Sequence, residues 1–431
     1  MQCLCLCLCH FLCLWLWLAV EVSGEHHLRG KHHRGGPRRA NGTHHEHALN
    51  YDYLQEKTAL FDNLTAPLLP GLGVNATSAL LIPSVLHIIH LREISSTTPK
   101  DLKYFVFLNL ISAVGHLRPS TLFIYCIESQ VPPSNLTSSH HQYKYWNLFL
   151  NMTRTHFSGT RVQLVHLDPA RDFKIFGYDP WQLTFKSDVI RMKALLRHGG
   201  IYVDTDVLIL NSLDKFRAHS PLVVGREEES ELDFTLCNAI MLAAPSSTFL
   251  QRWYDSYLTL PYTLANKHDT PYRLVACNDC HSGRLAGRLS LLFPSEVEII
   301  SRHEFFDISF SDEKLLFGGE SEEQWVANRA AAAAAAADSN SGGASQNSTA
   351  SRRARLAIAS MHFQHLWHSR PLNLKTLAQV DERYLCSSVS LYANMARLAL
   401  AREPSGLRDY LLSTCGALVL DATLRDFGLG Q

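Results

Sequence analysis

The clearest structural pattern in the chain is SDVIRMKALLRHGGIYVDTD, which runs from Ser187 to Asp206. Ser187 is a favoured N-cap residue, and the apolar residues after it recur at helical spacing until Gly199 and Gly200 end the helix. A short apolar strand follows and ends at Asp204 and Asp206. The stretch therefore predicts a helix, a glycine turn and a strand with two carboxylates at its carboxyl end.

These carboxylates suit one kind of chemistry. An Asp-x-Asp pair at a strand end offers hard oxygen ligands on one side of the strand, which suits Mg²⁺ or Mn²⁺, and either ion can bridge the oxygens of a diphosphate. The ion would then neutralise the leaving group of a nucleotide-sugar. Asp188 and Arg191 lie three residues apart on one face of the predicted helix, in its first turn. We expect this pair to face the same cleft and hold sugar hydroxyls.

Apolar runs elsewhere indicate further strands at 81–91 (LIPSVLHIIHL), 121–127 (TLFIYCI) and 161–167 (RVQLVHL). Helical stretches at about 101–114 and 142–152 separate them. Alternating strands and helices predict an α/β protein with a mostly parallel, doubly wound sheet. Such sheets bind ligands beyond the carboxyl ends of their strands, where the Asp pair is expected.

The amino terminus indicates a secreted or membrane-bound protein. Residues 3–20 are apolar except for His10, a run just long enough to cross a bilayer as a helix. Small residues follow at 22–24, as before a signal-peptidase site, but the first two residues lack the usual positive charge. Basic residues come after the run instead, which is unusual for a type II anchor. A cleaved signal peptide and an uncleaved anchor both stay open.

Composition divides the rest of the chain. Residues 25–50 are rich in His, Arg and Gly without an apolar period, which is typical of a solvated stem. The eight alanines Ala330–Ala337 and the polar stretch after them fit a surface insertion, because a strand-like pattern resumes at 356–359. We expect these parts: signal peptide or anchor 1–24, stem 25–77, catalytic domain 78–400 with a low-complexity insertion 327–352, and C-terminal tail 401–431.

Sequons and cysteines favour an oxidising compartment. Six Asn-x-Ser/Thr sequons are spread along the chain, at Asn41, Asn63, Asn75, Asn135, Asn151 and Asn347. Five of the eleven cysteines lie in the first thirteen residues, and six remain: Cys126, Cys237, Cys277, Cys280, Cys386 and Cys415. An even number permits fifteen full pairings, so disulfides are expected without a defined connectivity. The Cys-x-x-Cys-His at 277–281 also matches a haem-attachment pattern, which nothing else in the sequence supports.

Several blocks of the sequence resemble one known family. The block SDVIRMKALLRHGGIYVDTDVLIL closely resembles the sugar-binding Asp-x-Asp region of glycosyltransferase family 32. IPSVLHIIHL at 82–91 and CNAIMLA at 237–243 resemble other strands of that family. SMHFQHLW at 360–367 and LKTLAQVDERYLC at 374–386 are similar to the closing segments of its α1,4-galactosyl/α1,4-N-acetylglucosaminyltransferase branch. The resemblance covers roughly residues 80–400.

The resemblance implies a GT-A-type, Rossmann-like fold, with a mostly parallel sheet, flanking helices and a C-terminal helical segment. It implies a metal-dependent, retaining transfer of a hexose (galactose, N-acetylglucosamine or mannose) from a nucleotide diphosphate sugar to a hydroxyl of a glycan or glycolipid. Mn²⁺ or Mg²⁺ would be the cofactor. The expected location is the Golgi membrane or lumen, with membrane attachment through the N-terminal segment if it is not cleaved.

Carried over to this sequence, the resemblance makes Asp206 a direct metal ligand and lets Asp204 reach the ribose and the metal shell. His365 is the candidate that completes the metal or diphosphate site, with Trp367 packed beside it. Two further histidines compete with His365 for that role: His362 and His368.

Asp188 and Arg191 would bind the donor sugar, and Asn238 would lie near that sugar on the acceptor side. Lys186 precedes the Ser-Asp pair where relatives often carry a small residue, which leaves the choice of donor sugar open.

Other classes of protein fit less well. The 40 basic and 40 acidic residues balance, which argues against a nucleic-acid partner. A haloacid-dehalogenase-type phosphohydrolase also has Asp-x-Asp-x-Val at a strand end, but normally on the first strand, whereas at least three predicted strands precede VDTDV at 203–207. An inactive binding protein with the GT-A fold is the remaining alternative, and the intact Asp and Arg residues disfavour it.

Overall fold

The computed structural model describes most of the chain after residue 80. The described residues are 81–91, 98–132, 141–180, 182–218, 220–227, 235–259, 280–305, 308, 314–317, 360–366, 375–388, 390–403, 406–427 and 429. Several predicted features lie outside the described residues. They are the leader, the stem, the insertion at 327–352, the strand-like segment 356–359, Trp367 and every sequon except Asn151. Among the helices described, none combines the length and the apolar character needed to cross a membrane.

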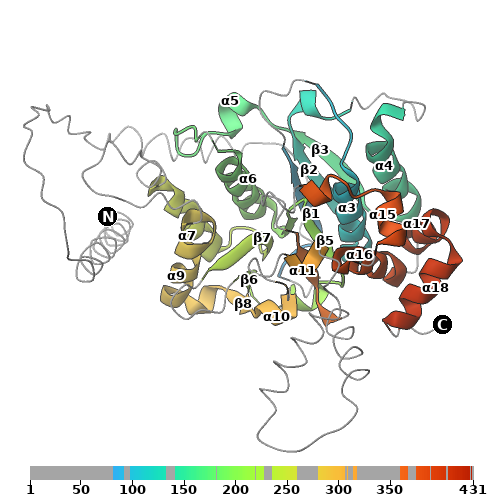
Figure 1. Ribbon diagram of the computed structural model, residues 1–431. Coiled ribbons are helices and arrows are strands. Elements are labelled where there is room, and N and C mark those ends of the chain that lie inside the picture. Colours follow the sequence, from blue (N-terminus) through green and yellow to red (C-terminus); the bar gives the residue numbers. More distant parts are fainter. Residues whose placement is uncertain are drawn as a thin grey trace, which may run out of the picture. The chain divides into compact units, whose positions relative to one another are not determined.

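The core of the described part is a seven-stranded sheet with the order β3-β2-β1-β4-β7-β6-β8 (Figure 1). The strands are β1 Val85–His90, β2 Thr121–Cys126, β3 Arg161–His166, β4 Gly200–Val203, β6 Leu222–Arg226, β7 Leu236–Ala243 and β8 Glu298–Ile300. Neighbours pair in parallel except at β7, which is antiparallel to both β4 and β6. The predicted α/β fold is confirmed, including three strands before the Asp pair.

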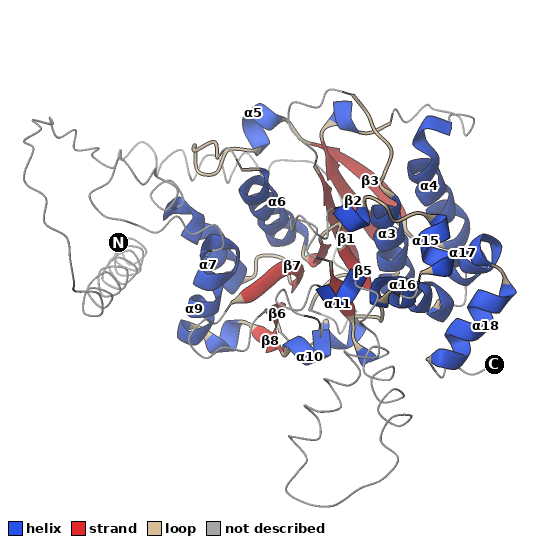
Figure 2. Ribbon diagram, viewed as in Figure 1, coloured by secondary structure: helices blue, strands red, loops and turns tan. Residues whose placement is uncertain are grey.

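Helices cover both faces of this sheet (Figure 2). Side chains alternate along a strand, so Leu86 and Ile88 of β1 enter one hydrophobic cluster, and Val85 and Ile89 enter the other. The first cluster includes α3 Tyr104–Leu117 and α4 Lys144–His156, and the second includes α6 Leu183–His198 and α7 Thr248–Ser256. Each face is thus buried under helices, as a doubly wound sheet requires.

The C-terminal segment is helical, as predicted, and it extends past the expected boundary at 400. Its helices are α15 Glu382–Ser387, α16 Leu391–Arg402, α17 Gly406–Cys415 and α18 Ala417–Asp426. Leu407, Leu411 and Leu420 belong to the same hydrophobic cluster as α3. A disulfide between Cys386 and Cys415 ties α15 to the end of α17. The residues expected as a tail therefore contain two helices that pack into the domain.

The expectation that Ser187 caps α6 is wrong. The helix begins at Leu183, after Gln182 in an extended conformation, so Asp188 and Arg191 lie beyond its first turn. Phe185 explains the earlier start, because it is fully buried and adds one more apolar position to the helical series. The Ser187 hydroxyl instead accepts a hydrogen bond from Nη2 of Arg191 at 3.1 Å.

Gly199 and Gly200 end α6 and begin β4 in a conformation that needs glycine. Their φ angles are +61° and +106°. A Cβ atom on Gly200 would lie 2.4 Å from the carbonyl oxygen of Val85, so a side chain there would separate β4 from β1. The glycine pair thereby lets the Asp-bearing strand pair directly with β1.

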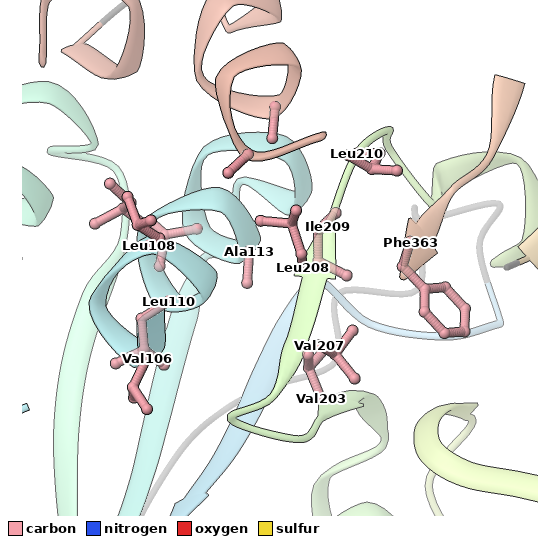
Figure 3. Packing of buried hydrophobic residues seen from close by; sticks show 14 of the residues in the cluster. Val106, Leu108, Leu110, Ala113, Val203, Val207, Leu208, Ile209, Leu210 and Phe363 are labelled. Atoms are coloured by element: carbon pink, nitrogen blue, oxygen red, sulfur yellow. The ribbon is translucent and has the colours of Figure 1, made fainter. Parts of the chain in front are cut away.

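A second, two-stranded sheet follows the Asp pair. It pairs β5 Val207–Ile209 with β9 Phe363–His365 in antiparallel register, with Val207 opposite His365. In Figure 3, Ala113 of α3 lies beside Leu208 and Ile209 of β5. Apolar packing therefore holds β5 against α3 and brings β9 next to the Asp pair.

The expectation of disulfides is confirmed for one pair, Cys386 and Cys415, and two other cysteines are unpaired. Cys126 and Cys237 are free and buried. They belong to β2 and β7, and β1 and β4 lie between these strands. Three inter-strand steps of about 4.8 Å exceed the Cα separation that a disulfide can bridge. Cys277 lies outside the described residues, as does the side chain of Cys280.

Candidate metal and sugar-nucleotide site

Asp204, Asp206 and His365 form a cluster at the carboxyl end of β4. One ligand atom from each residue lies within 4.8 Å of the others. Nε2 of His365 is 3.2 Å from Oδ2 of Asp206. The register of β9 against β5 places His365 there, and the Leu366 amide donates to the Asp206 carbonyl at 2.9 Å. Residues that are distant in sequence thus converge where a doubly wound sheet binds ligands.

Arg191 lies next to this cluster and contacts Asp204 with both ends of its guanidinium. Nη1 is 3.3 Å from Oδ2 of Asp204, and Nη2 is 3.3 Å from Oδ1. Nη1 also donates to the Asn238 carbonyl at 2.6 Å, and the guanidinium lies 4.5 Å from the ring centre of Tyr202. Tyr202 donates its hydroxyl to Oδ1 of Asp204. Two side chains therefore fix the orientation of Asp204.

Asp188 lies behind Arg191, and protein groups hold both of its oxygens. Nη2 of Arg191 is 3.2 Å from Oδ1, which also accepts from Nδ2 of Asn238 at 2.8 Å. Oδ2 accepts from the hydroxyl of Tyr257 at 2.9 Å. Asp188 and Arg191 are each only 4% exposed. A sugar hydroxyl would have to exchange with one of these partners to reach the Asp188 carboxylate.

Two side chains of α3 hold the backbone around the two aspartates. Nδ2 of Asn109, a residue that is 1% exposed, donates to the Thr205 carbonyl at 2.9 Å. Ser112, one turn further along α3, accepts from the Ile209 amide at 3.2 Å. On the other side, the Asp204 amide donates to the Ala239 carbonyl of β7 at 2.8 Å. The backbone that presents the carboxylates is therefore held from two directions.

The electrostatics of this site favour an added cation. Three carboxylates, those of Asp188, Asp204 and Asp206, face one guanidinium and one imidazole. Burial raises the pKa of Asp188, although Arg191 opposes the rise. Burial lowers the pKa of His365, but the carboxylates of Asp206 and Asp204 outweigh it, so the pKa is raised. Crowded carboxylates beside an imidazole that attracts a proton form a fitting donor set for a divalent ion.

The structure brings together every predicted site residue that it describes. Asp188, Arg191, Asp204, Asp206, Asn238 and His365 all contribute to the connected set above. His362 points elsewhere, since its Nδ1 lies 2.8 Å from the Ser212 carbonyl and its ring contacts Phe216. Trp367 and His368 lie outside the described residues.

Sequence reasoning missed three residues that support this set. Tyr202 and Tyr257 contact it directly, and Asn109 holds the backbone between its two aspartates through the Thr205 carbonyl. Tyr202 stands two residues before Asp204 in the strand, so the alternation of side chains could have indicated it. Asn109 is a polar residue within an apolar helix, which is another signal. Nothing in the sequence near Tyr257 marks it.

The fold and this site define an α/β protein with a carboxylate–imidazole cluster at the carboxyl end of a central strand. Residues 134–223 match a family model described as "Glycosyltransferase sugar-binding region containing DXD motif". This region contains Asp188, Arg191, Asp204 and Asp206.

Among curated proteins, the chain is 26% identical over 237 residues to "Glucan organizing enzyme 1" of Cryptococcus neoformans var. grubii, covering 53% of this chain and 54% of that protein. The chain thus spans about half the length of this relative. Among solved structures, it is similar to the glycosyltransferase GlyE of Streptococcus pneumoniae, with 8% identity, a TM-score of 0.35, and 80% and 64% of the two chains covered. It is also similar to the galactosyltransferase LgtC, with 11% identity, a TM-score of 0.33, and 70% and 98% covered.

Proposed function

We propose that this protein is a metal-dependent glycosyltransferase that transfers a hexose, with retention of anomeric configuration, from a nucleotide diphosphate sugar to a hydroxyl of a glycan or glycolipid. The observation that carries the proposal is the cluster of Asp204, Asp206 and His365, with ligand atoms within 4.8 Å of one another. The Asp pair of this cluster lies within the matched sugar-binding region. Retention and the choice of galactose, N-acetylglucosamine or mannose rest on the resemblance to glycosyltransferase family 32.

In this proposal Asp206, Asp204 and His365 would hold Mn²⁺ or Mg²⁺. The bound ion would supply a Lewis acid that neutralises the charge of the departing nucleotide diphosphate. The other residues of the site position this metal ligand set and form the wall beside it. Arg191 and Tyr202 keep Asp204 in place through contacts to both of its oxygens. Asn238 and the Asp188–Arg191 pair form the adjacent wall, where the donor sugar is expected.

A phosphohydrolase reading of the Asp pair fits this geometry poorly. In that class the first Asp attacks phosphorus and needs a free carboxylate oxygen. Here Oδ1 of Asp204 accepts from Tyr202, and both oxygens face Arg191. Charge-assisted contacts of this kind lower the nucleophilicity of the carboxylate, so we favour transfer of a sugar over hydrolysis of a phosphate.

We also propose that the protein works in the secretory pathway, in the Golgi membrane or lumen. The apolar leader and the six sequons support this location. The disulfide between Cys386 and Cys415 adds support, because disulfides persist mainly in oxidising compartments. Localisation of the tagged full chain by microscopy, with and without residues 1–24, tests the proposal. A cytosolic full chain would contradict it.

A donor screen tests the activity. The purified chain is incubated with UDP-galactose, UDP-N-acetylglucosamine, UDP-glucose or GDP-mannose, and release of the nucleotide diphosphate is measured with Mn²⁺, with Mg²⁺ and with excess EDTA. We expect one donor to be turned over faster than the others, and only with a divalent ion. Turnover that EDTA leaves intact would refute the metal site. The anomeric configuration of the product, read by proton NMR, tests retention.

A further inference from the structure

Tyr257 contacts the site from outside the matched sugar-binding region. It follows the end of α7, and its side chain is completely buried. Its hydroxyl donates to Oδ2 of Asp188 at 2.9 Å, and its ring packs against His281 with the ring centres 5.1 Å apart. The tyrosine is therefore positioned by packing and directs its single polar atom at one buried carboxylate.

A continuous set of contacts leads from Tyr257 to the proposed cation site. Asp188 holds Nη2 of Arg191 at 3.2 Å, and the two Nη atoms of Arg191 lie 3.3 Å from the two oxygens of Asp204. The side chains of Asp188 and Arg191 are 6% and 5% exposed, whereas that of Asp204 is 22% exposed. The buried part of this set thus contacts and supports the part that solvent reaches.

The orientation of Arg191 depends on Asp188, because a guanidinium is directional and its fork fits two acceptors only in one plane. Oδ1 of Asp188 is held by Asn238 at 2.8 Å. Among the described residues, Oδ2 has one hydrogen-bond partner, the hydroxyl of Tyr257. Without that hydroxyl the Asp188 carboxylate can rotate about its Cβ–Cγ bond. The guanidinium of Arg191 then no longer has a fixed orientation toward the two oxygens of Asp204.

We propose that Tyr257 is a positioning residue, which fixes the Asp188 carboxylate and, through Arg191, the orientation of Asp204 in the cation site. The inference rests on the proposed function, because it assumes that Asp204 and Asp206 hold a divalent ion. It adds a structural role for α7 and for the residue after it, neither of which lies in residues 134–223.

The test uses the full chain with Tyr257→Phe, which removes one oxygen atom and keeps the buried ring. Mn²⁺ is titrated without nucleotide, and the free ion is counted by its EPR signal. Since outer-shell partners of metal ligands typically contribute tenfold or more and Tyr257 acts one step further out, we expect the Kd for Mn²⁺ to rise roughly three- to tenfold.

The matched control is Tyr392→Phe. Tyr392 is 1% exposed and lies on α16, and its hydroxyl has no hydrogen-bond partner within the described part of the chain. Its loss should leave the Kd for Mn²⁺ unchanged. An unchanged Kd in Tyr257→Phe, or an equal rise in both variants, would overturn the proposal, because a loss common to both tyrosines reports general loosening of the core.

A second pair of variants tests the route, and it also serves if Tyr257→Phe fails to fold. Asp188→Asn removes the buried charge, so adding Tyr257→Phe to it leaves no carboxylate unpaired. We expect Asp188→Asn to raise the Kd and the added Tyr257→Phe to change it by less than about twofold, since residues in one network are not additive. A further large rise in the double variant would overturn the route through Asp188.

The outcomes separate this inference from the proposed function. If the unaltered chain binds Mn²⁺ and Asp206→Asn does not, the cation site stands, and the tyrosine variants alone decide the role of Tyr257. If the unaltered chain binds no Mn²⁺, the proposed site fails, and this inference fails with it.

Discussion

Two polar clusters lie at α6 and the strands beside it, and they differ in charge: one is acidic and the other is neutral. The carboxylate cluster comprises Asp188, Arg191, Asp204, Asp206 and His365. The imidazole cluster is centred on His87 of β1, whose Nε2 lies 2.8 Å from the Gly199 carbonyl and whose Nδ1 lies 3.1 Å from the Tyr125 hydroxyl. A carbonyl only accepts, so Nε2 carries the proton, and Nδ1 accepts from Tyr125.

The imidazole cluster is closed and neutral. Both nitrogens of His87 are paired, its ring stacks on Phe123 at 5.4 Å, and burial lowers its pKa to about 3. It fixes the start of β4 without any buried charge. The carboxylate cluster instead concentrates three acidic groups around one guanidinium. The polar groups around His87 are satisfied by one another, whereas the excess of negative charge in the carboxylate cluster favours binding of a cation.

The largest expected effect comes from Asp206→Asn, which removes a charge from the carboxylate cluster and keeps its shape. Loss of a direct metal ligand should reduce Mn²⁺-dependent nucleotide release by about a hundredfold or more. The measurement is the donor screen described above. Asp421→Asn, at an exposed position of α18, is the control and should be fully active. Full activity of Asp206→Asn would end the assignment of the site.

Arg191→Ala removes the only guanidinium of the carboxylate cluster. It leaves the buried carboxylate of Asp188 without its cation, and the partly exposed Asp204 loses the same partner, so the free energy of unfolding should fall by about 3–5 kcal/mol. Urea unfolding followed by circular dichroism measures the change. Arg191→Lys keeps the charge without the fork and should recover part of the loss. Equal stability of the alanine variant and the unaltered chain would show that the cluster is not organised by this arginine.

His365→Ala distinguishes His365, on β9, from the other described candidate, His362, which directly precedes that strand. We expect the Kd for Mn²⁺ to rise about tenfold, because the neighbouring Asp ligands remain. His362→Ala, just before the strand, should leave the Kd unchanged, since that imidazole contacts the Ser212 carbonyl and Phe216. A raised Kd for Mn²⁺ in His362→Ala and an unchanged Kd in His365→Ala would contradict the assignment of the metal site to the carboxylate cluster.

His87→Phe breaks the imidazole cluster and should have the smallest effect on function. The Gly199 carbonyl and the Tyr125 hydroxyl lose their partner, so the free energy of unfolding should fall by about 1–3 kcal/mol. Binding of Mn²⁺ by the folded variant should be unchanged. A loss of Mn²⁺ affinity as large as in His365→Ala would show that the two clusters are coupled.

The same variant tests the protonation state of His87. The pKa is about 3 in the folded protein against the ordinary 6.5, so the unfolded chain takes up a proton first as the pH falls. The stability that neutral His87 contributes is therefore complete above about pH 6.5 and declines toward pH 3, by up to about 1.4 kcal/mol per pH unit. His87→Phe should show a shallower decline. An unchanged slope would mean that His87 is already charged in the folded state.

Sequence reasoning succeeded where one local pattern determines the structure. The apolar runs that became β1 and β2 are continuous and buried, and the Gly-Gly pair before the Asp-bearing strand adopts the positive φ angles that glycine tolerates best. It failed at Ser187, because burial of Phe185 extends α6 by a turn and outweighs the capping preference. It also took residues 401–431 for a tail, since short amphipathic helices there depend on packing against α3 and α16.

The α/β class and the carboxylates that end the central strand follow from the amino-acid sequence alone, because they depend on local patterns. Which histidine lies beside these carboxylates depends on the pairing of β9 with β5, which is a feature of the tertiary structure. It likewise brought Asn238 and Tyr257 to Asp188 from β7 and from the end of α7. Contacts between distant segments arise from strand register and packing, and no local pattern in the chain contains that information.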